Sequence, residues 1–164
     1  MPTARRRYKL LQSAGVKQLK VFLSGEAGYG KTTLVRLLVH YWRSQGRRVL
    51  VCASTAKAAR LLGGHTVHRA FKLRANGACG FLAAELDGTQ HTPHWAWLYT
   101  RDIIVIDEIS MVEAALFDKL DHVARYVRGS DDAFGGIQLL VCGDFLQLPP
   151  VSKGGGPGAD FFAF

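Results

Sequence analysis

A short glycine-rich motif constrains the fold of this 164-residue chain more than any other feature. The string Gly-Glu-Ala-Gly-Tyr-Gly-Lys-Thr at residues 25–32 fits the pattern G-x-x-x-x-G-K-[ST]. An apolar run at Leu19–Ser24 precedes it and indicates a buried strand, and Thr32–Gln45 follows it with the spacing of a helix. In this context backbone N–H groups of the glycine loop turn toward a phosphate, and the helix start adds partial positive charge. The motif therefore predicts a nucleotide-binding strand–loop–helix unit.

The rest of the chain alternates apolar runs with amphipathic segments. In the first helix, Leu34, Leu37, Leu38 and Tyr41 lie at helical spacing, and Val35, Val39 and Trp42 widen this apolar stripe, which is expected to face the core. Further strands are predicted at 48–53, 102–107 and 137–142, further helices at 55–62 and from Ser110 to Gly129, and mainly loop at 75–100 with a short helix at 81–87. Ser110 and Glu113 have the spacing of a capping box. Continuous apolar strands separated by helices predict an α/β fold, a mostly parallel sheet with helices on both faces.

Polar residues follow two of the predicted strands. Asp107 and Glu108 end the run Ile-Ile-Val-Ile at 103–106, so they emerge at the carboxyl edge of the sheet beside the glycine loop. One carboxylate there can hold Mg²⁺ and the other can activate water, which favours hydrolysis over phosphoryl transfer by a kinase. Gln147 follows the last strand and is positioned to contact a γ-phosphate, although a solvent-facing turn glutamine is the alternative.

Charge is distributed unevenly along the chain. Residues 27–84 carry ten Lys and Arg and no acid, whereas residues 85–164 carry twelve acids and five Lys and Arg. The basic stretch therefore pairs with the acidic half, with a polyanion such as nucleic acid, or with both.

The composition and the N-terminal sequence also bear on the cellular location of the protein. No apolar run reaches the length of a membrane span, and no secretory signal is recognisable, which predicts an intracellular protein without a membrane partner. Three cysteines without a Cys-x-x-Cys pair favour a reducing compartment, although the Arg-rich start leaves an organelle presequence open. Cys79, His91 and His94 do not have the spacing of a common zinc site.

Four blocks of sequence resemble the PIF1-like ATP-dependent DNA helicases, which are close to the RecD-type helicases of superfamily one. They are residues 25–33, residues 53–59 with 63–71, Ile-Asp-Glu-Ile-Ser-Met-Val at 106–112, and Gly-Asp-Phe-Leu-Gln-Leu-Pro-Pro-Val at 143–151. The resemblance covers about residues 19–151 and implies a RecA-like P-loop NTPase domain. Residues 1–18 form a basic segment before this domain, and residues 152–164 a glycine-rich tail after it.

The resemblance also implies roles for individual residues. Lys31 and Thr32 would bind ATP and Mg²⁺, Asp107 would coordinate the metal, Glu108 would activate water, and Gln147 would couple the γ-phosphate to the DNA site. The nucleotide-contacting set is Gly25, Ala27, Gly28, Gly30, Lys31, Thr32, Thr33 and Asp107, and the single-stranded DNA set is Ser54, Thr55, Thr66, His68 and Phe71. For Phe71, packing in the core is the stronger alternative.

The chain also departs from the family pattern. Nothing in it matches the second motor domain that supplies arginines to the ATP site, and neither Gln12 nor Gln18 has the context of the family's adenine-contacting glutamine. The chain is therefore expected to be the first motor domain only, a monomer that lacks the second motor domain, and nuclear if eukaryotic. We expect it alone to bind Mg-ATP weakly and hydrolyse it slowly without unwinding DNA; the alternative is a nucleotide- and DNA-binding remnant without turnover.

Overall fold

The computed structural model describes residues 18–26, 28–71, 73 and 96–144. Its strands are β1 (Lys20–Leu23), β2 (Val49–Ala53), β3 (His65–Thr66), β4 (Ile103–Asp107) and β5 (Gln138–Cys142). Its α-helices are α2 (Lys31–Ser44), α3 (Ala56–Leu61), α4 (Val67–Ala70), α5 (Ala96–Tyr99) and α6 (Ala114–Arg128). Short 3-10 turns lie at Ile109–Met111 and Ala133–Gly136. The predicted helix at 81–87, the tail at 152–164 and the site candidates Ala27 and Gln147 lie outside the described residues.

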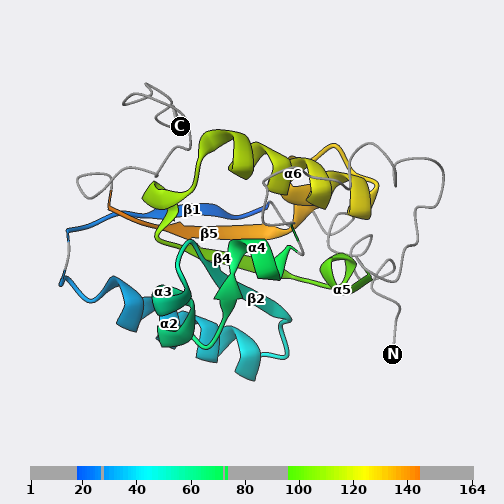
Figure 1. Ribbon diagram of the computed structural model, residues 1–164. Coiled ribbons are helices and arrows are strands. Elements are labelled where there is room, and N and C mark those ends of the chain that lie inside the picture. Colours follow the sequence, from blue (N-terminus) through cyan, green and yellow to red (C-terminus); the bar gives the residue numbers. More distant parts are fainter. Residues whose placement is uncertain (1–17, 27, 72, 74–95, 145–164) are drawn as a thin grey trace, which may run out of the picture.

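The described strands form one parallel sheet in the order β1-β5-β4-β2-β3 (Figure 1). Helices α2 and α3 lie on one face of this sheet, and α6 with α4 and α5 lies on the other (Figure 1). The predicted α/β fold with helices on both faces is therefore confirmed. Because parallel strands all run the same way, their carboxyl ends meet at a single edge, and this edge carries the residues discussed below.

The strand register brings distant residues to the same level of that edge. Leu23 of β1 pairs with Cys142 of β5, while Asp107 of β4 pairs with Ala53 of β2. Ala53 in turn pairs with Thr66 of β3. The glycine loop, the Asp107–Glu108 pair and the segments after β2 and β5 therefore leave the sheet side by side.

Alternating strand residues supply two hydrophobic clusters, one on each face. Ile104, Ile106 and Val141 pack with Leu120 of α6, whereas Val105 and Leu140 pack with Val35 of α2. Both faces of β2, β4 and most of β5 are buried, as the continuous apolar runs predict for central strands of a parallel sheet.

Phe71 belongs to the α6-side cluster. Its side chain is 0% exposed and meets Trp97 edge-on, with 6.3 Å between the ring centroids. The expectation that Phe71 contacts single-stranded DNA is therefore wrong for this structure, because no base can stack on a ring enclosed by the core. The alternative of core packing is confirmed.

The start of α6 differs from the predicted capping box. Ser110 lies in the 3-10 turn Ile109–Met111, and the helix begins at Ala114 with Glu113 as its N-cap and no side-chain cap hydrogen bond. The turn is held close to the next strand end, since a Cβ built on Gly143 would lie 3.2 Å from the backbone nitrogen of Ser110. The helix therefore begins about one turn later than predicted, after this tightly packed turn.

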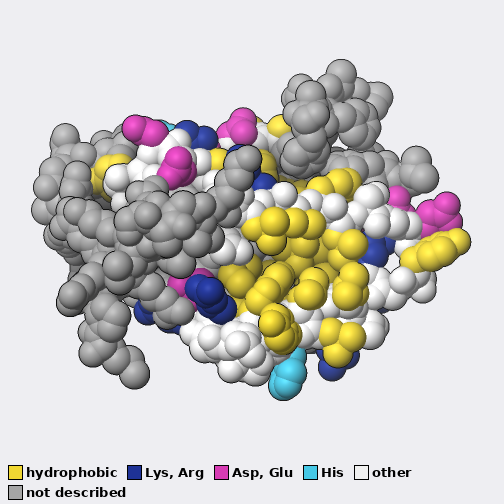
Figure 2. Space-filling model, turned by 180° about the vertical axis from the view of Figure 1, so that it is seen from behind, with side chains coloured by type: hydrophobic (Ala, Val, Ile, Leu, Met, Phe, Trp, Pro, Cys, Tyr) yellow, Lys and Arg dark blue, Asp and Glu magenta, His cyan; other side chains and the backbone are white. Residues whose placement is uncertain are grey.

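The first strand is more exposed than predicted. β1 pairs only with β5 among the described residues, and its Val21 and Phe22 are 36% and 37% exposed. On α2, Val35 and Val39 face the sheet, while Leu34, Leu37 and Tyr41 of the expected core stripe remain exposed. Figure 2 shows a broad hydrophobic area on this side of the molecule. The predicted buried strand is thus an edge strand in the described part of the chain.

None of the helices in the described ranges has the length and hydropathy needed to cross a membrane.

Replacing Phe71 by alanine tests its place in the core. We expect Phe71→Ala to lower the free energy of unfolding by about 3–5 kcal/mol, because it leaves a cavity in a closely packed cluster. Leu61→Ala is the matched control, since Leu61 is 57% exposed on α3 and its loss should cost under about 0.5 kcal/mol. Urea denaturation measures both values, and equal losses for the two variants would contradict the assignment.

Candidate nucleotide-binding and carboxylate site

The glycine loop between β1 and α2 has the backbone shape that its sequence predicts. Gly28 and Gly30 adopt φ values of 84° and 79°, which a residue with a side chain rarely takes, and Gly30 is the N-cap of α2. No acidic residue lies in the first turn of α2. The free N–H groups of this helix start and its partial positive charge therefore remain available to an anion.

Lys31, the first residue of α2, folds back over the loop. Its ammonium donates hydrogen bonds to the backbone carbonyl of Gly25 and, at 2.8 Å, to that of Glu26. Thr32 and Thr33 follow in the first turn, with Thr32 half-buried and Thr33 exposed. The structure thus holds a cation directly beside the helix N-terminus.

Asp107 ends β4 and is only 3% exposed. Its carboxylate accepts a hydrogen bond of 3.0 Å from the backbone N–H of Glu108. Glu108 itself adopts left-handed backbone angles, φ 55° and ψ 46°, which cost a non-glycine residue about 1 kcal/mol or more. The strand ends here, and Glu108 is less buried than Asp107.

The charges of the site act on one another. Burial raises the pKa of Asp107, while the N–H of Glu108 and the positive charge of Lys31 lower it. Burial also raises the pKa of Glu108, as do the negative charges of Asp107 and Asp144, and Lys31 again opposes the shift. The structure therefore brings Lys31, Asp107 and Glu108 into one electrostatic cluster, as the sequence predicts.

Sequence reasoning missed Asp144 as a member of this cluster. Asp144 lies two residues after β5 and is 6% exposed, and its charge contributes to the raised pKa of Glu108. The same rule that selected Asp107, an acid directly after a buried strand, could have found it. Burial and the charge of Asp107 also raise the pKa of the neighbouring Cys142 thiol to about 12, so this cysteine remains a neutral core residue.

The candidates for DNA contact lie on the α3–β3–α4 side of the same edge. Thr55 and Thr66 are the N-caps of α3 and α4, and their hydroxyls accept hydrogen bonds from Ala58 N and Arg69 N. His68 is exposed on α4. The backbone N–H of Ser54 donates to the carbonyl oxygen of Asp107 at 3.2 Å, so the segment after β2 is tied to the carboxylate strand.

The donor groups at this edge fit Mg²⁺ better than a transition metal. The Thr32 hydroxyl and the Asp107 carboxylate supply hard oxygen ligands, and the buried carboxylate has no ion pair of its own among the described residues. No group of three or more His, Cys, Asp or Glu forms a metal cage in the described part of the chain. Magnesium needs no such cage, because it is usually held by one or two protein oxygens together with phosphate and water.

Comparison with known proteins identifies the family. A family model described as PIF1-like helicase matches residues 8–163. This chain belongs to the PIF1-like helicase family. It is 44% identical over 144 residues to the human ATP-dependent DNA helicase PIF1 and 41% identical over 140 residues to RRM3 of Saccharomyces cerevisiae. These alignments cover 88% and 84% of this chain but only 22% and 19% of the relatives, so the chain spans about a fifth of their length.

Solved PIF1-like helicases have the same fold. A Pif1 helicase from Bacteroides in complex with ADP-AlF3 and ssDNA superposes with a TM-score of 0.68 and 32% sequence identity, over 93% of this chain and 34% of that one. Pif1 helicase from Candida albicans gives a TM-score of 0.67 and 34% identity, again over 93% of this chain and 34% of that one.

The buried carboxylate predicts a pH-dependent stability. Because burial raises the folded-state pKa of Asp107 above its unfolded value, the ionised carboxylate destabilises the fold at neutral pH, and this loss is recovered as the pH falls through the folded-state pKa. We expect Asp107→Asn, which keeps an oxygen for the Glu108 N–H, to raise Tm at neutral pH, because it removes the buried charge.

The gain should shrink as the pH is lowered from neutral, because protonation of Asp107 removes the same buried charge that Asp107→Asn removes. Thermal unfolding followed by circular dichroism measures it across this range. Asp118→Asn is the control, because Asp118 is exposed on α6. A gain for Asp107→Asn that persists unchanged at low pH would show that the carboxylate charge is not its cause.

Proposed function

We propose that this chain is a motor domain of an ATP-dependent DNA helicase that binds ATP with Mg²⁺, hydrolyses it and binds single-stranded DNA. The cluster of Lys31, Asp107 and Glu108 beside the N-terminus of α2 is the observation that carries the proposal. It combines an anion-binding helix start, a cation for phosphate and two carboxylates with different surroundings. Family membership supports the same activity, since the relatives are named ATP-dependent DNA helicases.

The glycine loop would bind the triphosphate. Backbone N–H groups of Gly28, Gly30 and the following helix turn would donate to the phosphate oxygens, with Gly25, Ala27 and Thr33 completing the contacts. Lys31 would exchange its two carbonyl partners for β- and γ-phosphate oxygens, which are stronger acceptors for an ammonium group. Thr32 and Asp107 would hold Mg²⁺, which neutralises phosphate charge when it is bound.

Glu108 would act as the general base toward the attacking water. Its pKa is raised by burial and by the neighbouring carboxylates, which makes it a stronger base than an ordinary surface glutamate. Glu108 is also less buried than Asp107, which suits a base that must reach a water molecule. Gln147 is proposed, from the sequence, to contact the γ-phosphate and report its presence.

Single-stranded DNA would cross the α3–β3–α4 side of the edge. Exposed His68, the segment Ser54–Thr55 and Thr66 lie there, within the acid-free basic stretch. The hydrogen bond from Ser54 N to the Asp107 carbonyl supplies a direct connection between the DNA side and the ATP side. A change of metal or phosphate contacts at Asp107 would thereby reach the DNA-binding segment.

The complete helicase is proposed to contain a second motor domain. Translocation requires two domains that open and close around ATP, and an arginine supplied across a nucleotide site is worth about 10³–10⁵ in rate in related NTPases. We propose residues 19–151 as the first motor domain, with residues 1–18 and 152–164 flanking it, and 5′-to-3′ unwinding in DNA repair, recombination or telomere maintenance as the whole protein's role. An intracellular protein, nuclear in a eukaryote and monomeric, fits this role.

ATP hydrolysis by the purified chain distinguishes a motor domain from a remnant that binds without turnover. We expect slow hydrolysis that single-stranded DNA stimulates, and a loss of the stimulated rate by at least about 10²-fold in Glu108→Gln, which removes the general base but keeps the side-chain size. Phosphate release measures the rate, and nucleotide binding to Glu108→Gln should persist.

Glu113→Gln is the matched control for that variant, because Glu113 is an exposed glutamate five residues further along. If DNA fails to stimulate hydrolysis and Glu108→Gln equals the wild type, the chain binds nucleotide without turning it over. The isolated chain should not separate strands of a forked duplex, and robust unwinding by it would refute the need for a second domain.

Binding of fluorescent single-stranded DNA tests the proposed DNA side. We expect His68→Ala to weaken binding about 2- to 10-fold, the value of one hydrogen bond, and affinity to fall with rising salt. His122→Ala is the control, since His122 is an exposed histidine on α6 rather than on α4. Equal affinities for the two variants would place the DNA elsewhere. Thr55 and Thr66 are poorer test positions, because replacing either N-cap destabilises its helix.

A further inference from the structure

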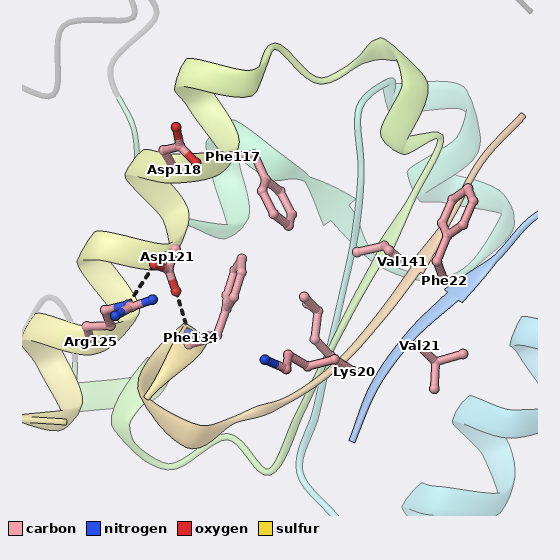
Figure 3. A pocket seen from close by; sticks show the side chains of 11 residues that line it. Lys20, Val21, Phe22, Phe117, Asp118, Asp121, Arg125, Phe134 and Val141 are labelled. Carbon is pink, nitrogen blue, oxygen red and sulfur yellow. Dashed lines mark hydrogen bonds and ion pairs between the residues drawn. The ribbon is translucent and has the colours of Figure 1, made fainter. Parts of the chain in front are cut away.

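A hydrophobic pocket of about 420 Å³ lies between α6 and the β1–β5 side of the sheet, away from the nucleotide site (Figure 3). Aromatic side chains from three elements line it: Phe22 of β1, Phe117 of α6 and Phe134 of the turn before β5. Leu139 and Val141 of β5 form its floor. Charged side chains also line it: Lys20 and Arg125 are basic, Asp118 and Asp121 are acidic, and Arg125 pairs with Asp121.

The walls of this pocket are held in place by specific contacts. Asp121 of α6 accepts a hydrogen bond from the backbone N–H of Phe134 and forms an ion pair with Arg125 at 2.6 Å (Figure 3). The rings of Phe117 and Phe134 pack with centroids 5.2 Å apart. Gln18, just before β1, donates to the carbonyls of Ala133 and Ile137. The pocket is thus built by contacts among α6, the turn and the start of β1.

The direction of the chain along the sheet decides which face each helix covers. As the chain moves from β1 toward β3, its helices α2 and α3 lie on one face. As it returns from β3 to β4 and then to β5, α4, α5 and α6 lie on the other. This regularity is the right-handed crossover rule of parallel sheets. By the same rule, a connection from β5 to a further parallel strand beyond β1 would lie on the α6 face, where the pocket is.

We propose that the aromatic segment Phe161-Phe162-Ala163-Phe164 fills this pocket. Phe161 is 17 residues beyond Asp144, a length that spans up to about 55 Å, whereas the pocket extends along strands of about 17 Å. The intervening sequence contains four glycines between 154 and 158, so it restricts the return path little. Asp160 directly precedes the aromatic residues and provides a charge opposite to that of Lys20 at the rim.

This inference is independent of the proposed enzymatic activity, and photo-crosslinking in the complete chain tests it. p-Benzoylphenylalanine in place of Phe162 should react with the peptides that contain Phe22, Phe117 or Phe134 in the same molecule, as mapped by mass spectrometry. The same group in place of Ser152 is the control and should not label these peptides. Crosslinks to α2, or between two copies of the chain, would overturn the proposal in favour of another surface or of a dimer.

A double-mutant cycle provides a second test. Replacing Phe161, Phe162 and Phe164 together by serine should lower Tm by at least about 4 °C in the wild type, but by less than about 1 °C when Phe22→Ser has already weakened the pocket. Phe22 is 37% exposed, so its replacement leaves the core intact. In the control background Leu37→Ser, on the opposite face, the full effect should remain. Additive losses in the Phe22→Ser background would refute docking at this site.

Discussion

The parallel register of β1, β5, β4 and β2 is the constraint on which the site depends. It places Leu23 opposite Cys142 and Asp107 opposite Ala53, so strands far apart in the sequence end together. Each strand then contributes one functional segment at its carboxyl end. Backbone hydrogen bonds along the whole ladder maintain this arrangement, and a slip of one residue would turn Asp107 from the edge and exchange the β4 side chains that face α2 with those that face α6.

Burial of like charges is the energetic consequence of that arrangement. Asp107 and Asp144 are almost fully buried, and Glu108 lies in their field, so burial raises the pKa of both Asp107 and Glu108. A single cation, Lys31, offsets part of this unfavourable charge. A site of this kind gains stability when a cation or a metal–phosphate complex binds, because the bound charge replaces the water that the carboxylates lost.

The β1 edge of the sheet shows a different constraint. β1 carries exposed apolar side chains on both faces, and α2 keeps several leucines in contact with water. Large exposed hydrophobic areas usually mark surfaces that another segment or protein covers. The chain spans about a fifth of the length of its curated relatives.

Local sequence determined much of this protein. The glycine loop, the apolar strand runs and the acids after β4 depend on neighbouring residues, so the α/β fold, the family and the Lys31–Asp107–Glu108 cluster were all predictable. Tertiary packing decided the rest. Phe71 is in the core because Trp97 and the α6-side cluster enclose it, Ser110 is not a helix cap because Gly143 packs against its turn, and β1 is exposed because its only described neighbour is β5. The sequence shows which side chains are apolar and which of them share one face of an element. Only the arrangement of all the elements determines whether another element covers that face.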